Sequence, residues 1–227
     1  MSEVRRVRLT VAYHGAQFRG SAANPGVPTV MGDLAMAIAM IVRQPIELTA
    51  AGRTDAGVHA WGQIVSGDLP AGTDLADLAR RVNKLCAPGI AVRAAEWAES
   101  PEFNARFSAT SRSYRYHVWN DPAPNPLAAD TVWHVPKPLA VEAMRAGAAS
   151  LVGEHDFGAF CRRPDGDVSL VRILYEFDVR TDASPMVVFH VRGSAFCHQQ
   201  VRSMVGTLVD VGLGRIAADS IDAIIAS

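Results

Sequence analysis

The sequence lacks several features that would place it outside the ordinary globular proteins. Its 227 residues contain three cysteines, Cys86, Cys161 and Cys197, and no C-x-x-C pair. This argues against a disulfide framework and against a zinc finger. Its apolar runs are far shorter than the ~20 residues needed to cross a bilayer, and residues 1–8 are charged where a secretory signal would be apolar. We therefore expect a cytoplasmic protein with no membrane partner.

Lysine is also scarce, and the chain has no surplus of positive charge. Its only lysines are Lys84 and Lys137, so arginine supplies nearly all of the positive charge, while the formal net charge is −1. Nucleic-acid-binding proteins usually show a basic surplus, whereas arginine in particular suits contacts to phosphates and bases. Composition therefore leaves RNA binding open without supporting it. With 49% hydrophobic residues, the chain can form one large domain or two small ones.

The hydrophobic pattern predicts strands and helices along the whole chain. Apolar residues alternate in several segments, as in half-buried strands, and other segments carry apolar stripes with helical spacing. Thr29 is placed to N-cap the first helix. The predicted strands are 7–13, 90–98, 113–120, 171–179 and 187–191, and the predicted helices are 30–41, 74–86, 139–152, one from about Gln199 and one from about Ala217.

The order strand–helix–strand–strand occurs on each side of about Pro101. It predicts an α+β protein of two similarly built halves, residues 1–101 and 102–227, each a mostly antiparallel sheet covered by helices. We expect the N-terminal half to carry a catalytic aspartate loop and the C-terminal half to carry further site residues. The active-site cleft is then expected between the two halves.

The most unusual segment is Ala51–Ala60, with the sequence AGRTDAGVHA. Gly52 and Gly57 bracket an arginine, a threonine and an acid between two apolar strands. Because glycine permits positive φ or the close approach of another backbone, such a loop could hold the carboxylate of Asp55 at the surface of a cleft. Taken by itself, the same pattern is more typical of a tight turn capped by the acid.

Further segments, in the same order and spacing, resemble the tRNA pseudouridine synthase A family. Ala51–Ala60 resembles the catalytic loop of that family, and the resemblance spans about residues 4 to 215. The other matching segments are Tyr13–Gly20, Thr29-Val30, Phe103–Ala109 followed by Arg112–Tyr116, Leu151–Phe157 and Val201–Leu208.

The resemblance implies an isomerase that converts uridine to pseudouridine in the anticodon stem-loop of tRNA, at positions 38–40. This reaction breaks the N1–C1′ bond, turns the uracil and joins C5 to C1′. It involves neither a redox change nor a group transfer, so no metal and no organic cofactor is expected. The resemblance also implies a homodimer with one tRNA across both subunits. The alternative is a non-catalytic RNA-binding protein on the same fold.

The resemblance also assigns roles to individual residues. Asp55 matches the essential aspartate, which acts ionised as nucleophile or base, by attack on C1′ or C6 or by deprotonating the sugar. Arg202 matches the arginine that pairs with this acid and favours its charged form. Tyr114 matches the tyrosine that packs on the flipped base. Without the motifs, Arg202 would be a solvated helix residue and Tyr114 a sheet aromatic, as we expect of Tyr116. Candidate phosphate contacts are Arg53, Arg106, Arg112, Arg162 and Arg163.

Two other kinds of site are disfavoured by spacing. An aspartic protease needs two carboxylates that share a proton, and no second loop like that of Asp55 exists. Metal ligation would need histidines and cysteines at ligand spacing. The candidates are expected to be structural residues instead, namely His59, His155, Cys161, Cys197 and His198.

The chain departs from the family pattern at three places. Ser21-Ala22 stands where the family usually has Trp-Gln, and Gln200 stands where it usually has methionine. The family continues beyond the position of Ser227 to a closing strand with a Gly-Leu pair. The C-terminal half as given is therefore expected to lack that strand.

Overall fold

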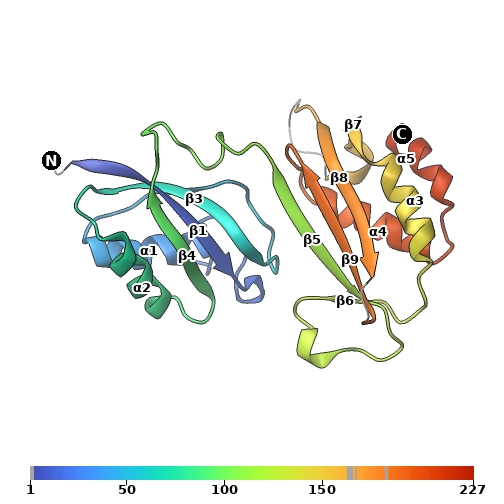
Figure 1. The fold of residues 1–227 in the computed structure, drawn as a ribbon, viewed down its shortest axis with the longest axis horizontal. Helices are drawn as coiled ribbons and strands as arrows, with labels where there is room; N and C mark the ends of the chain where they lie inside the picture. The colour runs from blue at the N-terminus through green and yellow to red at the C-terminus, as the bar shows by residue number, and fades with distance from the viewer. Residues whose placement is uncertain (1–2, 163–165, 167, 182–183) are drawn as a thin grey trace. The chain divides into compact units, whose positions relative to one another are not determined.

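The computed structural model describes residues 3–162, 166, 168–181 and 184–227, in two compact units, Met1–Ala109 (unit 1) and Thr110–Ser227 (unit 2) (Figure 1). Each unit is a β-sheet with helices packed against one face, which confirms the expected α+β class. Of the candidate phosphate contacts, Arg163 lies outside the described residues.

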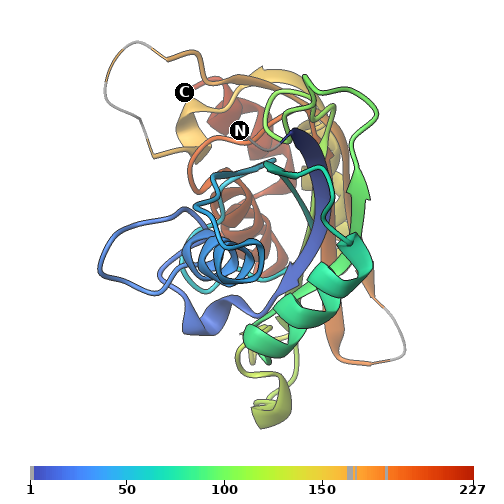
Figure 2. The same cartoon turned by 90° about the vertical axis from the view of Figure 1, so that its left-hand side faces the viewer.

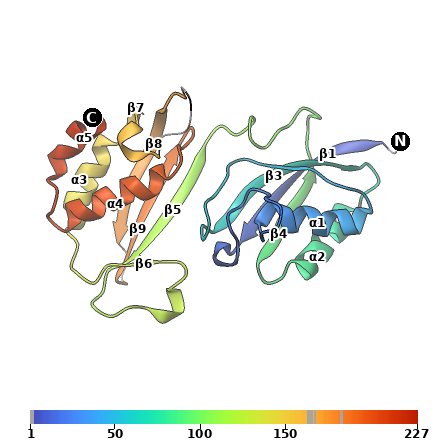
Figure 3. The same ribbon diagram turned by 180° about the vertical axis from the view of Figure 1, so that it is seen from behind.

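Unit 1 is built on a four-stranded antiparallel sheet with the order β2-β3-β1-β4. Helices α1 and α2 lie side by side against one face of this sheet (Figures 2 and 3). The elements are β1 Val4–Tyr13, the 3-10 turn η1 Gly15–Gln17, α1 Val30–Val42, β2 Leu48–Ala50, β3 Ala60–Pro70, α2 Leu75–Leu85 and β4 Ile90–Trp97.

Local sequence explains these elements. Val7, Leu9 and Val11 of β1 are fully buried under the helices, as the period-two pattern predicts. Thr29 and Asp74 cap α1 and α2, because their side-chain oxygens accept backbone N–H groups of the first helical turn. Both predicted helix starts are therefore confirmed.

Residues 102–109 pack on the opposite face of the unit 1 sheet. Arg6 donates a hydrogen bond from Nη1 to the carbonyl oxygen of Phe103 at 2.8 Å, and the N–H of Ala105 donates to Oγ of Ser66 at 3.0 Å. These bonds hold the segment to strands β1 and β3. The chain accordingly passes from unit 1 to unit 2 between Ala109 and Thr110, C-terminal to the boundary expected near residue 101.

Unit 2 is built on a five-stranded sheet with the order β6-β5-β9-β8-β7. Its pairs are antiparallel except for β5 with β6, which is parallel. Helices α3, α4 and α5 cover one face (Figures 1 and 3). The elements are β5 Arg112–Trp119, η2 Pro126–Ala128, β6 Trp133–His134, α3 Val141–Ser150, β7 Gly153–Asp156, η3 Gly158–Phe160, β8 Val171–Thr181, β9 Met186–Gly193, α4 Gln200–Gly212, η4 Ala218–Ser220 and α5 Ile221–Ile225.

The alternation predicted for residues 171–179 is wrong in its first half. The pairing of β8 with β9 shifts register between Leu174 and Glu176, as at a β-bulge, so the strand changes which side chains it turns to the core. Leu174 is buried, whereas Val171 and Tyr175 are 42% exposed. From Phe177 onward the predicted alternation holds.

The predicted helices of unit 2 are confirmed. α3 is shorter than the predicted 139–152, α4 begins at Gln200 as expected, and α5 begins at Ile221, after the short η4. In α4, Met204, Val205 and Leu208 are fully buried against the sheet, as their spacing predicts. Within the described residues, no helix has the length and apolar character needed to cross a membrane.

Candidate active site

Asp55 lies on the tight loop that joins β2 to β3 in unit 1, and it is exposed. The N–H of Val58 donates to the carbonyl oxygen of Asp55 at 3.2 Å, which closes a turn. Gly57 in this turn has φ +81°, a conformation that favours glycine. The sequence motif therefore forms a surface turn that presents a carboxylate, as expected.

Thr54, the residue before Asp55, is held by hydrogen bonds to Ser21 and to Tyr13. The N–H of Thr54 donates to Oγ of Ser21 at 2.7 Å, and the N–H of Ser21 donates back to the carbonyl oxygen of Thr54 at 3.0 Å. The hydroxyls of Thr54 and Tyr13 are 2.8 Å apart. Ser21 is 1% exposed and Tyr13 is 5% exposed, and burial raises the pKa of Tyr13. These contacts with two buried residues hold the backbone next to Asp55.

Close backbone approach explains two glycines of the Tyr13–Gly20 segment. A Cβ at Gly15 would overlap the carbonyl oxygen of Val58. A Cβ at Gly20, whose φ is +101°, would lie 3.3 Å from the carbonyl oxygen of Thr54. The segment therefore packs directly on both sides of the Asp55 turn, as only glycine permits.

His59 contacts the segment that precedes α1. Its Nδ1 accepts the N–H of Gly15 at 3.1 Å, and its ring centroid lies 4.4 Å from that of His14. No group of three or more possible metal ligands occurs among the described residues.

Tyr114 lies on β5 of unit 2, on the face of the sheet that carries the helices. Its ring meets Phe196 edge-on, with centroids 5.1 Å apart. Tyr116 lies two residues further along and meets Trp133 edge-on at 6.5 Å. Tyr114 thus makes an edge-to-face contact with Phe196 and remains partly exposed. A partly exposed aromatic ring suits a surface on which a base can stack.

Arg202 lies in the first turn of α4 and is exposed, next to the buried stripe of that helix. The helix start is organised by Gln200, which is fully buried. Its Oε1 accepts the N–H of Cys197 at 2.8 Å, and its amide nitrogen lies 3.9 Å from Sδ of Met204. Gln200 is therefore a satisfied buried polar residue that fixes the turn preceding Arg202.

The arginines that are candidates for phosphate contacts differ in the contacts that they make within the protein. Arg53 and Arg106 are exposed, and the guanidinium of Arg106 lies 5.5 Å from the ring centroid of Phe107. Arg112 instead donates to the carbonyl oxygen of Ser194 at 2.8 Å, so part of its side chain ties β5 to the segment after β9. Arg162 follows η3, and its N–H donates to the carbonyl oxygen of His198 at 3.2 Å.

Each half thus contributes part of the expected residue set. Unit 1 carries Arg53, Asp55 and Arg106, and unit 2 carries Tyr114 and Arg202. Reading the sequence missed the support that Tyr13 and Ser21 give to the turn. The glycines of the preceding segment were the only local signal, because glycine often marks close backbone approach.

Comparison with known proteins gives consistent similarities. A sequence model of a family described as tRNA pseudouridine synthase matches residues 148–227. A tRNA pseudouridine synthase A of Frankia casuarinae is 46% identical over 213 residues, which cover 92% of this chain and 77% of the relative. Proteins of the same description from Cutibacterium acnes and Burkholderia lata are 39% and 40% identical, over 98% and 94% of this chain and 81% and 78% of their own lengths.

Proposed function

The chain belongs to the tRNA pseudouridine synthase A family, and on that premise we propose that it isomerises uridine to pseudouridine at positions 38–40 of the tRNA anticodon stem-loop. The observation that carries this proposal is the exposed carboxylate of Asp55 on a turn whose backbone is held by hydrogen bonds to the buried residues Tyr13 and Ser21. A reacting group held in one geometry lowers the entropic part of the barrier.

The chemistry of the isomerisation explains why a carboxylate on a fixed turn is sufficient for catalysis. The base leaves C1′ through N1, turns, and rejoins C1′ through C5, while a proton leaves C5 and N1 carries one in the product. Substrate and product have the same composition, so the reaction requires no oxidant and no co-substrate. We propose that Asp55, ionised, supplies the nucleophile or base, and that the enzyme works without a cofactor.

The other site residues are proposed from the motifs that contain them. The ring of Tyr114 provides the surface on which the flipped base packs. The guanidinium of Arg202 provides a positive charge in the site. Arg53 and Arg106 contact phosphates, which is supported by the exposure of both side chains.

We further propose that the enzyme is a cytoplasmic homodimer. A chain of net charge −1 can present a basic groove to RNA when two copies bring their arginines together. Light scattering at micromolar concentration is expected to report a dimer. A monomer alone under those conditions would contradict this part of the proposal.

A tritium-release assay tests the activity directly. Uridine in a transcribed tRNA is labelled at C5, and release of tritium to water reports each new C5–C1′ bond. We expect release from a tRNA with uridine at positions 38–40 and none from a tRNA with cytidine at all three. A chain that binds tRNA but releases no tritium would refute the proposed activity.

A further inference from the structure

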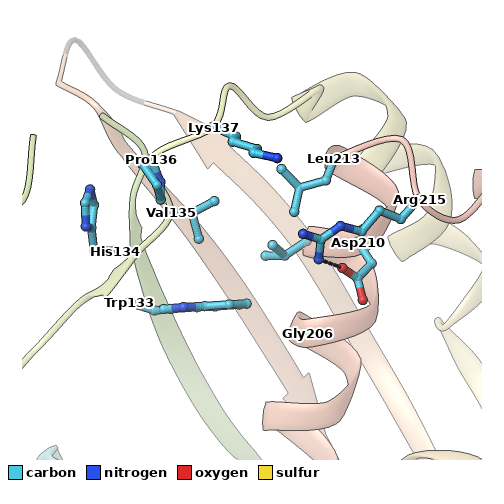
Figure 4. Close-up of a pocket in the computed structure, with 10 residues that line it drawn as sticks. Trp133, His134, Val135, Pro136, Lys137, Gly206, Asp210, Leu213 and Arg215 are labelled. Atoms are coloured by element: carbon cyan, nitrogen blue, oxygen red, sulfur yellow. Dashed lines mark hydrogen bonds and ion pairs between the residues drawn. The ribbon is translucent and has the colours of Figure 1, made fainter. Parts of the chain in front are cut away.

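The hollow beside β6 and the second half of α4 in unit 2 belongs to the packing of its sheet (Figure 4). Its lining includes the apolar side chains of Trp133, Val135 and Leu213. In the family to which the chain belongs, a closing strand follows the last helix at this edge of the sheet, so the hollow is not a free surface. The polar residues that hold the Asp55 turn in unit 1 are buried without that strand.

Gln63, in β3, is a polar residue on a mostly apolar face of the unit 1 sheet. Its Cα lies opposite that of Val11 in β1, and Val11 is fully buried under α1 and α2. Side chains directly opposite each other in an antiparallel pair point to the same face. Gln63 is therefore half-buried on the side that carries the helices, where an amide needs hydrogen-bond partners.

The amide of Gln63 has one of these partners in the Ala51–Ala60 segment. Its Nε2 donates to the carbonyl oxygen of Gly52 at 2.8 Å. A carbonyl oxygen can only accept, so this position requires a donor. The side chain of Gln63 also hydrogen-bonds the side chain of Tyr13. Gln63 thus joins the segment that contains Asp55 to a buried residue of β1.

Tyr13 makes a matching contact on the other side of Arg53. Its hydroxyl lies 2.8 Å from that of Thr54. Burial raises the pKa of Tyr13 more than its hydrogen bonds lower it, so the phenol keeps its proton at neutral pH. Gly52 and Thr54 are the two chain neighbours of Arg53. Both neighbours are therefore held by one hydrogen-bonded pair, Gln63 and Tyr13.

The hydrogen bond to Gly52 acts directly on the backbone of Arg53. The carbonyl oxygen of Gly52 and the backbone nitrogen of Arg53 belong to one planar peptide unit, so a bond that fixes the oxygen also orients the start of Arg53. Among the described residues, no hydrogen bond or ion pair holds the exposed side chain of Arg53. The direction in which its guanidinium leaves the turn therefore depends on the backbone.

We propose that Gln63 is a positioning residue for Arg53: by holding the Gly52–Arg53 peptide, it directs the guanidinium toward a phosphate of the bound tRNA and makes no contact with the RNA itself. The inference rests on the proposed function, which supplies the RNA and the phosphate contact of Arg53. An arginine that is directed before binding loses less conformational freedom when it meets the phosphate, so the affinity rises without a further contact.

A double-mutant cycle on tRNA binding tests this assignment. Arg53→Gln removes one phosphate contact and is expected to lower the slope of log affinity against log salt concentration by about 0.7–0.9. Gln63→Met, which has a side chain of similar length without an N–H donor, is expected to produce most of the same fall. The double variant should show no greater fall than Arg53→Gln alone, because Gln63 acts through Arg53.

Gln44→Met is the matched control. Gln44 is a half-buried glutamine of unit 1 in the connection from α1 to β2, so the chemical change is the same and the Gly52–Arg53 peptide keeps its hydrogen bond. Its salt slope should equal that of the wild type. Gln63→Asn, whose amide is shorter by one methylene, should resemble Gln63→Met and replaces it in the cycle if Gln63→Met fails a melting-temperature check for folding.

An unchanged slope in the folded Gln63 variants would overturn the assignment. Falls for Gln63→Met and Arg53→Gln that add in the double variant would also overturn it, because additive effects indicate independent contacts. An equal fall in Gln44→Met would show a general loss of packing and remove the positioning role.

The positioning role and the proposed activity fail separately. Tritium release by the wild type, together with a wild-type salt slope in every Gln63 variant, would leave the activity standing and remove the role of Gln63. A wild type that binds tRNA but releases no tritium would remove the activity, while the cycle of Gln63 with Arg53 still decides the positioning role.

Discussion

Ser21 and Thr54 are joined by two hydrogen bonds of opposite direction, although 33 positions separate them in the sequence. Each residue donates its backbone N–H, one to a hydroxyl and the other to a carbonyl oxygen. The N–H of Met31 also donates to the carbonyl oxygen of Ser21 at 3.0 Å, so the same residue ties the start of α1 to the turn. The conformation of Asp55 thus depends on a serine that precedes the motif by a long stretch of chain.

Ser21→Ala should remove the acceptor of the half-buried N–H of Thr54. The cost of leaving a fully buried donor unsatisfied, about 1–3 kcal/mol, is the upper limit for this change. We expect a lower urea midpoint and a fall in kcat, because Thr54, which precedes Asp55 in the turn, loses one of the three hydrogen bonds that tie it to Ser21 and Tyr13. Ser113→Ala, at an exposed position of β5, is the control and should change stability by less than about 0.5 kcal/mol. An unchanged kcat in Ser21→Ala would show that this bond does not position the turn.

Asp55→Asn keeps the shape of the side chain and removes its charge. We expect tritium release to fall below detection while tRNA binding, measured by filter retention, survives. Glu99→Gln removes one charge from an exposed position of the same unit and should retain full activity. Substantial turnover by Asp55→Asn would eliminate this carboxylate as the nucleophile or base.

The roles of the ring and of the hydroxyl of Tyr114 can be tested by separate variants. Tyr114→Phe keeps the ring that meets Phe196 edge-on, so tRNA affinity should be close to that of the wild type. Turnover by this variant drops only if the phenol moves the C5 proton. Tyr114→Ala should lose the stacking surface, worth about 1–3 kcal/mol per base, and both affinity and turnover with it. Normal affinity in Tyr114→Ala would contradict a stacking role.

Cys161 should be an unreactive thiol. Burial, together with the hydrogen bond to Cys197, raises the pKa of Cys161 to about 12. Because the thiolate is the nucleophile, only about one molecule in ten thousand is reactive at pH 8, and the rate of alkylation should rise with pH up to that pKa. Mass spectrometry after iodoacetamide treatment should find Cys161 unmodified in the native protein and modified in urea. Rapid alkylation of the native protein at pH 8 would refute the raised pKa.

Patterns among residues close together in the sequence were sufficient to predict most of the helices and strands. The alternation of Val7, Leu9 and Val11, the cap at Thr29 and the helix start near Asp74 depend on residues within a few positions of one another, so they could be predicted directly. The two-residue strand β6 was missed, because a pairing of that length leaves no periodicity. The bulge near Leu174 was missed as well, since it exists only in the pairing of β8 with β9.

The sequence by itself determined the α+β class, the family and the identity of the candidate residues, because motifs and periodicities are local properties of the chain. Only the tertiary structure decided how those residues are supported. The ties from Ser21 and Tyr13 to Thr54 join residues that lie far apart in sequence. Hydrogen bonds of this kind form only when separate elements pack, so no local pattern encodes them.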